Sequence, residues 1–281
     1  MKQQLSLRAS VCLALATLAS SSTLAAGFQV NEHSANGLGR AMAGQAAMAE
    51  NASILATNPA AIGVFTTSQF SGSISFIDPN VDVSAQTTSY VATEAGNLTV
   101  ASEDASEDDI ADTAFVPGFF YTTPINEKFS AGVGVFTTYG LRSDYSDDFE
   151  ALPFADEAEV KSVTFNPAIS YKVNEQLMVG FGLSATYTEA EIGSGVSESL
   201  SFAFNALGTN VPAGASLFNL EGDDWGYGWN AGIFWQPTDM TNIALSHRAE
   251  TKLELSGEVS SDLRAALNQD GSLDLNLAAI T

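Results

Sequence analysis

The chain has 281 residues, with 33 acidic and 10 basic side chains and a net charge of −23 at pH 7. This charge argues against binding to nucleic acid, because phosphates require a basic surface. A hydrophobic content of 45%, with 17 phenylalanines and 7 tyrosines, is too high for a disordered acidic protein.

Residues 1–26 have the organisation of a secretory signal peptide. Basic residues at Lys2 and Arg8 precede an apolar stretch at 11–18, and small residues follow it. The apolar stretch is shorter than the roughly 20 residues of a spanning helix, which favours cleavage over a retained anchor. The single cysteine, Cys12, lies inside this segment, so the mature chain would lack thiols for a disulfide or a metal site.

The segment 27–65 lacks regular alternation and contains small residues, glycines and the dipeptide Asn58-Pro59, which indicate short helical turns and loops. A linker is the simple alternative. A linker would rarely carry so many apolar side chains, among them Met42 and Ile62. We therefore predict a compact N-terminal plug, or hatch, over residues 27–65.

From residue 66 onward, apolar and polar side chains alternate with period two, which is the pattern of strands with two different faces. In Ser162–Val173, for example, Val163 and Phe165 share one face and Thr164 lies on the other. The segments are longer than those usual in soluble sheets and suit membrane strands of about 9–11 residues plus rims. We predict strands near residues 67–77, 114–123, 128–139, 162–173, 176–188, 224–236 and 241–256, with a further strand starting at Leu273.

The connections between these strands alternate in length. Short ones at 124–127, 174–176 and 237–241 alternate with long ones at 78–113, 140–161 and 189–223. This order is typical of a membrane barrel with tight periplasmic turns and long extracellular loops. No uninterrupted apolar stretch long enough for a spanning helix follows the signal segment. The fold class is therefore all-β, a transmembrane antiparallel β-barrel of which residues 66–281 supply about seven strands.

The acidic runs fall in the long connections. Glu103–Asp109 contains five acidic residues in seven, and Asp144–Glu159 is similarly acidic. Neither run has the ligand spacing and glycine of an EF-hand calcium loop, so we interpret both as solvated loops. No metal site and no cofactor are predicted.

An enzyme is a poor alternative. The two histidines, His33 and His247, have no neighbouring acid and nucleophile at a recognisable spacing, and catalytic motifs such as G-x-S-x-G or H-E-x-x-H are missing. A general diffusion porin is a better alternative, because it shares the architecture. The apolar segment 27–65 favours a plugged transporter over an open porin.

Seven short stretches in order along the chain carry a resemblance to a known family. They are Ala26–Glu32 (AGFQVNE), Gly37–Ala41 (GLGRA), Asn58-Pro59-Ala60, Pro124-Ile125-Asn126, Tyr139-Gly140-Leu141, Trp225–Gly232 (WGYGWNAG) and Ser260–Leu263 (SSDL). In these stretches the chain resembles the outer-membrane long-chain fatty acid transporters, a family that includes aromatic hydrocarbon importers. The resemblance covers essentially the whole mature chain.

The resemblance implies a fourteen-stranded barrel with an N-terminal hatch in the outer membrane of a Gram-negative bacterium, working as a monomer in contact with outer-membrane lipid. The expected partner is a long-chain fatty acid or another hydrophobic small molecule. Family members capture the ligand on an extracellular groove, pass it to a pocket beside the hatch and release it sideways. The lateral gap lies beneath an inward kink in the third strand.

The resemblance also implies roles for particular residues. The strand kink and lateral gap would lie at Tyr139, Gly140 and Leu141, since glycine permits a bend in a strand. Asn58, Pro59 and Ala60 would form the hatch segment that faces the gap, and Phe28 would line the inner pocket. The simpler readings are a strand end at Gly140 and a plain turn at Asn58-Pro59.

The chain departs from the family pattern after Tyr187, where fatty acid transporters tend to place a basic residue that meets the ligand carboxylate. Here that stretch has no lysine or arginine. Arg248 or Lys252 is the candidate replacement, unless each pairs with a neighbouring glutamate in a structural ladder. A carboxylate without a partner in an apolar pocket would be costly, so an uncharged alkane or aromatic hydrocarbon is the alternative ligand.

Seven strands would leave an open edge, which cannot sit in lipid with unsatisfied backbone groups. Single-chain bacterial barrels close with an even number of strands. We therefore expect a truncated product or an incomplete record of a longer protein. Closure by eight strands is the alternative, and its lumen would be too narrow for the predicted plug.

Overall fold

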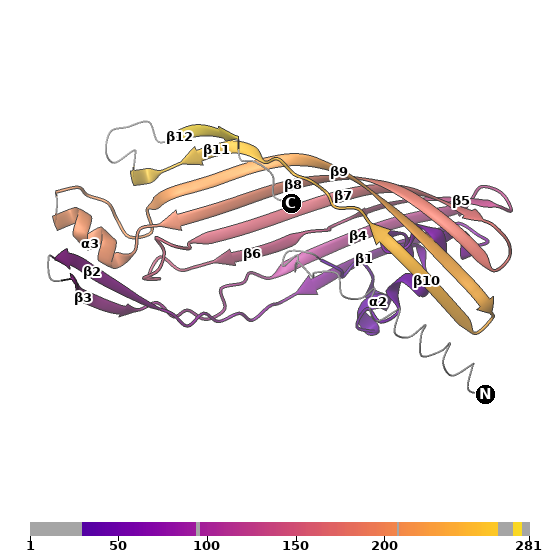
Figure 1. The fold of residues 1–281 in the computed structure, drawn as a ribbon, viewed down its shortest axis with the longest axis horizontal. Helices are drawn as coiled ribbons and strands as arrows, with labels where there is room; N and C mark the ends of the chain where they lie inside the picture. Colours follow the sequence, from indigo (N-terminus) through magenta and orange to yellow (C-terminus); the bar gives the residue numbers. More distant parts are fainter. Residues whose placement is uncertain (1–29, 94–95, 207, 264–271, 277–281) are drawn as a thin grey trace.

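The computed structural model describes residues 30–93, 96–206, 208–263 and 272–276 (Figure 1). The predicted signal peptide and Phe28 lie outside these residues. The hatch consists of short turns, with α2 at Ala35–Gly39, η1 at Gln45–Ala47, η2 at Ala52–Ala56 and η3 at Pro59–Val64. Within the described ranges, no helix is both long enough and apolar enough to cross a membrane.

One antiparallel sheet forms most of the molecule. Its strands are β1 (Gln69–Ile77), β4 (Ala114–Pro124), β5 (Phe129–Phe136), β6 (Gly140–Asp144), β7 (Glu157–Lys172), β8 (Leu177–Gly195), β9 (Ser216–Thr238), β10 (Thr241–Arg248), β11 (Ser256–Ser260) and β12 (Ser272–Asn276).

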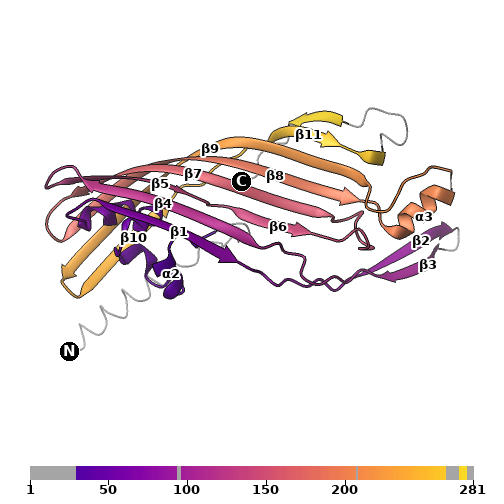
Figure 2. The same cartoon turned by 180° about the vertical axis from the view of Figure 1, so that it is seen from behind.

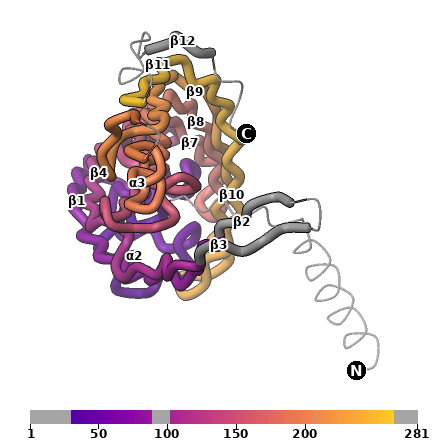
Figure 3. The backbone as a smooth tube through the Cα atoms, turned by 90° about the vertical axis from the view of Figure 1, so that its left-hand side faces the viewer, coloured from indigo at the N-terminus to yellow at the C-terminus, as the bar shows by residue number. Residues whose placement is uncertain are grey.

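The strands of this sheet pair in the order β1-β4-β5-β7-β8-β9-β11-β12, while β6 pairs with β7 and β10 pairs with β9. Viewed roughly along the strands, the sheet curls into an arc (Figure 3). The hatch packs against the inner side of this arc. The predicted all-β barrel architecture is confirmed as a curled part of a barrel wall.

The inner and outer faces of this sheet have the opposite polarity to a soluble sheet. On β7, outward-facing Val163 and Phe165 are 52% and 49% exposed, whereas inward-facing Thr164 and Asn166 are fully buried. On β9, Tyr227 is 72% exposed. Apolar side chains turned outward and hydrogen-bonded polar side chains turned inward are what a lipid-facing wall around a polar lumen requires.

The two ends of the sheet differ. Short turns join β4 to β5, β7 to β8 and β9 to β10, and the hatch lies toward that end (Figure 2). The opposite end carries the hairpin of β2 (Gln86–Thr93) and β3 (Gly96–Asp104), together with α3 (Glu198–Ala206). The predicted alternation of short and long connections is therefore confirmed.

Several predicted boundaries were wrong, and most errors lie toward the long-loop end. The loop expected at 78–113 contains the β2–β3 hairpin, and β8 and β9 extend into the loop expected at 189–223. At the end of β8, Gly193–Gly195 are buried in succession beneath Leu152 and Asp156, so the apolar alternation disappears although backbone pairing continues. The further strand predicted at Leu273 is present as β12.

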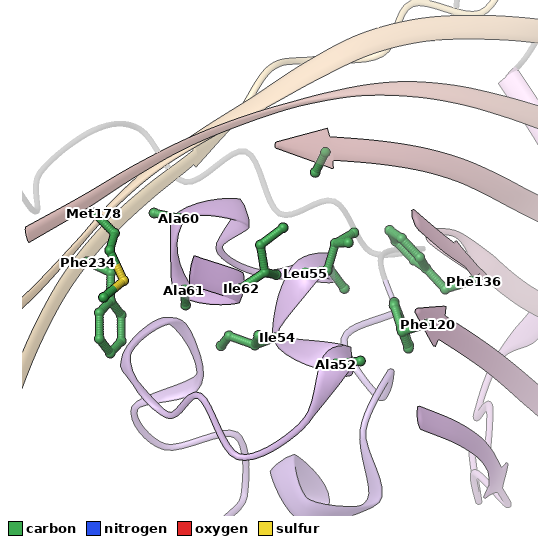
Figure 4. Packing of buried hydrophobic residues seen from close by; sticks show 12 residues of the cluster. Ala52, Ile54, Leu55, Ala60, Ala61, Ile62, Phe120, Phe136, Met178 and Phe234 are labelled. Atoms are coloured by element: carbon green, nitrogen blue, oxygen red, sulfur yellow. The ribbon is translucent and has the colours of Figure 1, made fainter. Parts of the chain in front are cut away.

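The largest buried cluster joins the hatch to the wall. Leu55 and Ile62 of the hatch are fully buried and pack in one cluster with Phe120, Phe136 and Phe234 of the strands (Figure 4). Burial of such side chains contributes about 1.5–3 kcal/mol each. The segment 27–65, as far as it is described, is therefore packed against the barrel wall and does not hang free as a linker.

Candidate functional site

Asn58 fastens the hatch to the inner wall. Its Oδ1 accepts a hydrogen bond from the Ala60 amide at 3.0 Å, which caps η3, and its Nδ2 donates to the carbonyls of Ala46 at 3.0 Å and Ile233 at 3.3 Å. Ser170 of β7 donates to the Ala60 carbonyl at 2.8 Å. The side chain of Asn58 is fully buried, so this predicted hatch segment is an anchor on β7 and β9.

The strand predicted at 128–139 ends early, and a further strand begins inside the loop expected at 140–161. β5 ends at Phe136 and β6 begins at Gly140, and both pair with β7. Pairing between β4 and β5 stops at Gly118 opposite Phe136, and contact resumes only where the Asp112 amide donates to the Arg142 carbonyl at 3.3 Å. Residues 137–141 are thus unpaired with β4 over the described backbone, which leaves a gap in wall pairing.

The stretch from Val30 to Ser34, which we call the strap, covers this gap on the inner side. The Val30 amide donates to the Thr138 carbonyl at 2.8 Å. The hydroxyls of Ser73 and Ser75 on β1 donate to the carbonyls of His33 and Glu32, each at 2.9 Å. The strap is therefore the described hatch segment that lies at this gap, whereas Asn58-Pro59-Ala60 contacts β7, β8 and β9.

A second interruption divides the strand predicted at 241–256. β10 pairs with β9 as far as Arg248 opposite Asn230, and β11 resumes with Ser256 opposite Asp223. The segment between them bends inward and lies over the inner face of β9. A Cβ built on Gly226 of that face would overlap Thr251 and lie 2.8 Å from Leu253 Cδ2. The glycines of the β9 inner face make room for this bend.

The two interruptions lie at the same height in the wall. Following the register from β5 across β7 and β8, Phe136 is level with Gly226 of β9. Following it from β6, Gly140 is level with Asp223. The continuous panel β7–β8–β9 is therefore flanked on both edges by breaks in strand pairing.

A cavity of about 380 Å³ lies between the hatch and the wall, next to the first interruption. It is lined from the hatch by Asn31, Glu32, His33, Met42, Gln45, Ala56 and Thr57, and from the barrel wall by Phe136, Thr138, Ser246 and Arg248. Three of these lining residues are apolar, Met42, Ala56 and Phe136, and the other eight are polar or charged, among them the cation Arg248.

Arg248 is the cation of this cavity. Its guanidinium donates to the Ala56 carbonyl at 2.6 Å and lies over the Phe136 ring, 5.5 Å from the ring centroid. Of the carboxylates in the described residues, none forms an ion pair with Arg248. Lys252 is exposed and does not line the cavity. The glutamate ladder considered for these two cations is therefore not formed.

The structure separates the remaining predicted site residues into two places. Tyr139, Gly140 and Leu141 lie at the first interruption, and Asn58, Pro59 and Ala60 lie deeper on the inner wall. A Cβ at Gly140 would have its nearest neighbour 3.6 Å away, so the space around this residue does not require a glycine.

Of the eleven residues that line the cavity, sequence reasoning proposed only Arg248 as a site residue, and among those it missed are His33 and Phe136. The His33 ring packs on the Phe136 ring with centroids 4.8 Å apart. His33 was noticed only as a poor catalytic candidate, and Phe136 looked like any other strand aromatic. A signal was available for Phe136, because it precedes the break in alternation at residues 137–139.

Comparison with known proteins agrees with this architecture. The family model for outer membrane protein transport proteins (OMPP1/FadL/TodX) matches residues 16–281. Outer membrane protein P1 of Haemophilus influenzae is 31% identical over 274 residues, covering 90% of this chain and 60% of that protein. The long-chain fatty acid transport protein of Escherichia coli K12 is 31% identical over 271 residues, covering 90% of this chain and 58% of that protein.

A solved structure of a Pseudomonas aeruginosa FadL homologue has the same fold, with a TM-score of 0.62 and 21% identity over 83% of this chain and 55% of that chain. The chain spans about three fifths of the length of the curated relatives it matches. Membership of the family places the protein in the outer membrane. The chain therefore belongs to the OMPP1/FadL/TodX family of outer-membrane transport proteins.

Proposed function

We propose that the protein takes up hydrophobic molecules across the outer membrane, and that its ligand is an amphipathic anion of the long-chain fatty acid class. The ligand is held in the cavity between the hatch and the wall. Its apolar chain packs against Phe136 and Met42, and its carboxylate meets Arg248.

The observation that carries this proposal is the unpaired charge of Arg248. A partly buried cation without an acidic partner is costly, and most such groups in proteins are paired. Glu32 lines the same cavity, but neither it nor another described carboxylate forms an ion pair with Arg248, which favours an anion supplied from outside. A carboxylate matches the planar guanidinium and can accept two hydrogen bonds from it.

The proposed route continues sideways. The unpaired stretch at Thr137–Leu141 lies beside the cavity, since Phe136 and Thr138 line it. An apolar ligand is poorly soluble in water, so release into lipid through the wall is more favourable than release into the periplasm. Displacement of the strap would open this path.

The second candidate is uptake of an uncharged aromatic hydrocarbon, because the matching family also includes the TodX proteins. A neutral ligand would leave Arg248 unpaired. We therefore favour the anionic ligand.

The test is uptake by a transporter-null strain that produces the complete protein. Radiolabelled oleate, toluene and a small sugar are followed in parallel, with the empty strain as the control. Accumulation of oleate supports the proposal, and accumulation of toluene alone supports the hydrocarbon importer. Uptake of the sugar without either apolar compound would replace the proposal with a general porin.

A further inference from the structure

His33 is a buried titratable group to which the proposed transport route assigns no role. His33 is only 9% exposed, and its Nδ1 atom is buried with no hydrogen-bond partner among the described residues. An unsatisfied buried nitrogen costs about 1–3 kcal/mol. Groups of this kind call for an explanation beyond packing.

The position of His33 supplies one. The imidazole lines the same cavity as Arg248, and both groups lie against the Phe136 ring, at 4.8 Å and 5.5 Å from its centroid. The strap backbone at His33 is fixed by the Ser73 hydroxyl, so the imidazole is held against this wall of the cavity. Two nitrogen-bearing groups thus converge on one apolar ring.

We propose that His33 and Arg248 together bind the anionic head group of the ligand, and that His33 takes up a proton when the head group arrives. This inference rests on the proposed function. His33 would then add a second charge-assisted hydrogen bond to the one from Arg248. The head-group site would be most strongly occupied when a proton is available.

The charges around His33 set the direction of this effect. Burial, and then the positive charge of Arg248, lower the pKa of His33 to about 4, so it is neutral near pH 7 in the empty cavity. An anion bound beside Arg248 cancels that repulsion and raises the pKa of His33. By linkage, binding takes up protons and tightens as the pH falls.

Few other charged groups face His33 from the described elements packed against it. Glu32 on the strap also lines the cavity, and its Oε2 accepts from the Asn31 amide at 2.8 Å. Tyr139 is the other titratable side chain near Arg248. The contacts from β1 and β4 are the Ser73 and Ser75 hydroxyls and the Gly118 backbone, none of which titrates.

The experiment measures binding of dodecanesulfonate to the purified protein in detergent, by calorimetry at about pH 5 and about pH 8 in two buffers of different ionisation enthalpy. A sulfonate stays ionised across this range, so any pH dependence belongs to the protein. The variants are His33→Gln and, as a matched control, His247→Gln, because His247 is exposed on the outer face and packs against Trp229 with tilted rings.

We expect the unmodified protein and His247→Gln to bind severalfold more tightly at the lower pH, with measurable proton uptake. We expect His33→Gln to bind with nearly equal affinity at both values. Binding that is independent of pH in the unmodified protein, or a pH dependence that persists in His33→Gln, would overturn the inference and leave the proposed function standing. No binding at either pH would overturn both.

Discussion

Gly180 of β8 and Gly232 of β9 are register partners, and the hatch rests directly on this pair. A Cβ at Gly180 would overlap the backbone of Pro59 and Ala60, and a Cβ at Gly232 would overlap the Asn58 side chain. Because the two glycines have no side chains, the hatch backbone can approach the inner wall closely here, and Asn58 can reach the Ile233 carbonyl.

Replacing either glycine by alanine should loosen the hatch. Forcing an extra methyl into a closely packed contact costs about 1–3 kcal/mol, so Gly180→Ala and Gly232→Ala should lower the unfolding temperature and expose the hatch to protease. Gly140→Ala is the matched control, since its Cβ has room, and it should change the unfolding free energy by less than about 0.5 kcal/mol. Equal behaviour of all three variants would contradict the packing described.

The strap should open when its anchors on β1 are removed. Ser73→Ala together with Ser75→Ala deletes two hydrogen bonds, each worth about 0.5–1.5 kcal/mol. The reporter is Val30→Cys, a thiol at a buried strap position, in a background with Cys12 replaced. In the double serine variant this thiol should react with a maleimide roughly tenfold faster or more.

Ser68→Ala is the control for the strap, because Ser68 bonds the Thr123 hydroxyl at an exposed site away from His33. It should leave the maleimide reaction of the Val30→Cys reporter unchanged. If the double variant labels no faster than this control, the two serines do not hold the strap closed.

The inward bend between β10 and β11 can be distinguished from a regular strand by cysteine pairs. In the structure Gly226 faces Thr251, so Gly226→Cys with Thr251→Cys should form a disulfide, seen as a mobility shift that a reductant reverses. If β10 continued in its register from Arg248 opposite Asn230, Thr251 would instead lie opposite Tyr227. Efficient cross-linking of Tyr227→Cys with Thr251→Cys, and not of the first pair, would therefore contradict the bend and show that β10 continues as one strand.

Acid should weaken the hold of the strap. The pKa of His33 is lowered to about 4 from 6.5, so the unfolded chain binds more protons than the folded chain between these values. The stabilisation is therefore fully present above about pH 6.5 and is lost as the pH falls toward 4, up to about 3 kcal/mol. The labelling rate of Val30→Cys, divided at each pH by the rate in the unfolded protein to remove the ionisation of the thiol, measures it, and adding His33→Phe should flatten this normalised curve. An unchanged curve with His33→Phe would assign the effect to other groups.

Much of the wall was predictable from the sequence, and the reasons are physical. Within the membrane one face of each strand contacts lipid and the other contacts the lumen. Apolar residues such as Val163 and Phe165 therefore alternate with polar residues, and this alternation identifies the strands in the sequence. The inward bend at 249–255 was not predictable, because Leu253 and Leu255 continue the same alternation yet are buried. Which face an apolar residue takes depends on the glycines of β9, which are distant in sequence.

The cavity was predictable only in part. Arg248 was identified as a candidate because the alternation of its strand turns it toward the lumen, and its place beside the hatch depends on the register of β9 and β10. His33 and Phe136 come together only through the fold, since more than a hundred residues separate them in sequence. Lys252 was an equal candidate in the sequence and is excluded from the cavity by the bend.

The most direct test of the central claim compares the binding of oleate and of methyl oleate to the unmodified protein, Arg248→Gln and Lys252→Gln. The ester keeps the apolar chain and removes the charge, so it isolates the contact with Arg248. We predict that the unmodified protein and Lys252→Gln prefer oleate, and that Arg248→Gln loses roughly tenfold or more in oleate affinity with little change for the ester. Equal affinity of the unmodified protein for the two ligands would contradict an anion-binding cavity.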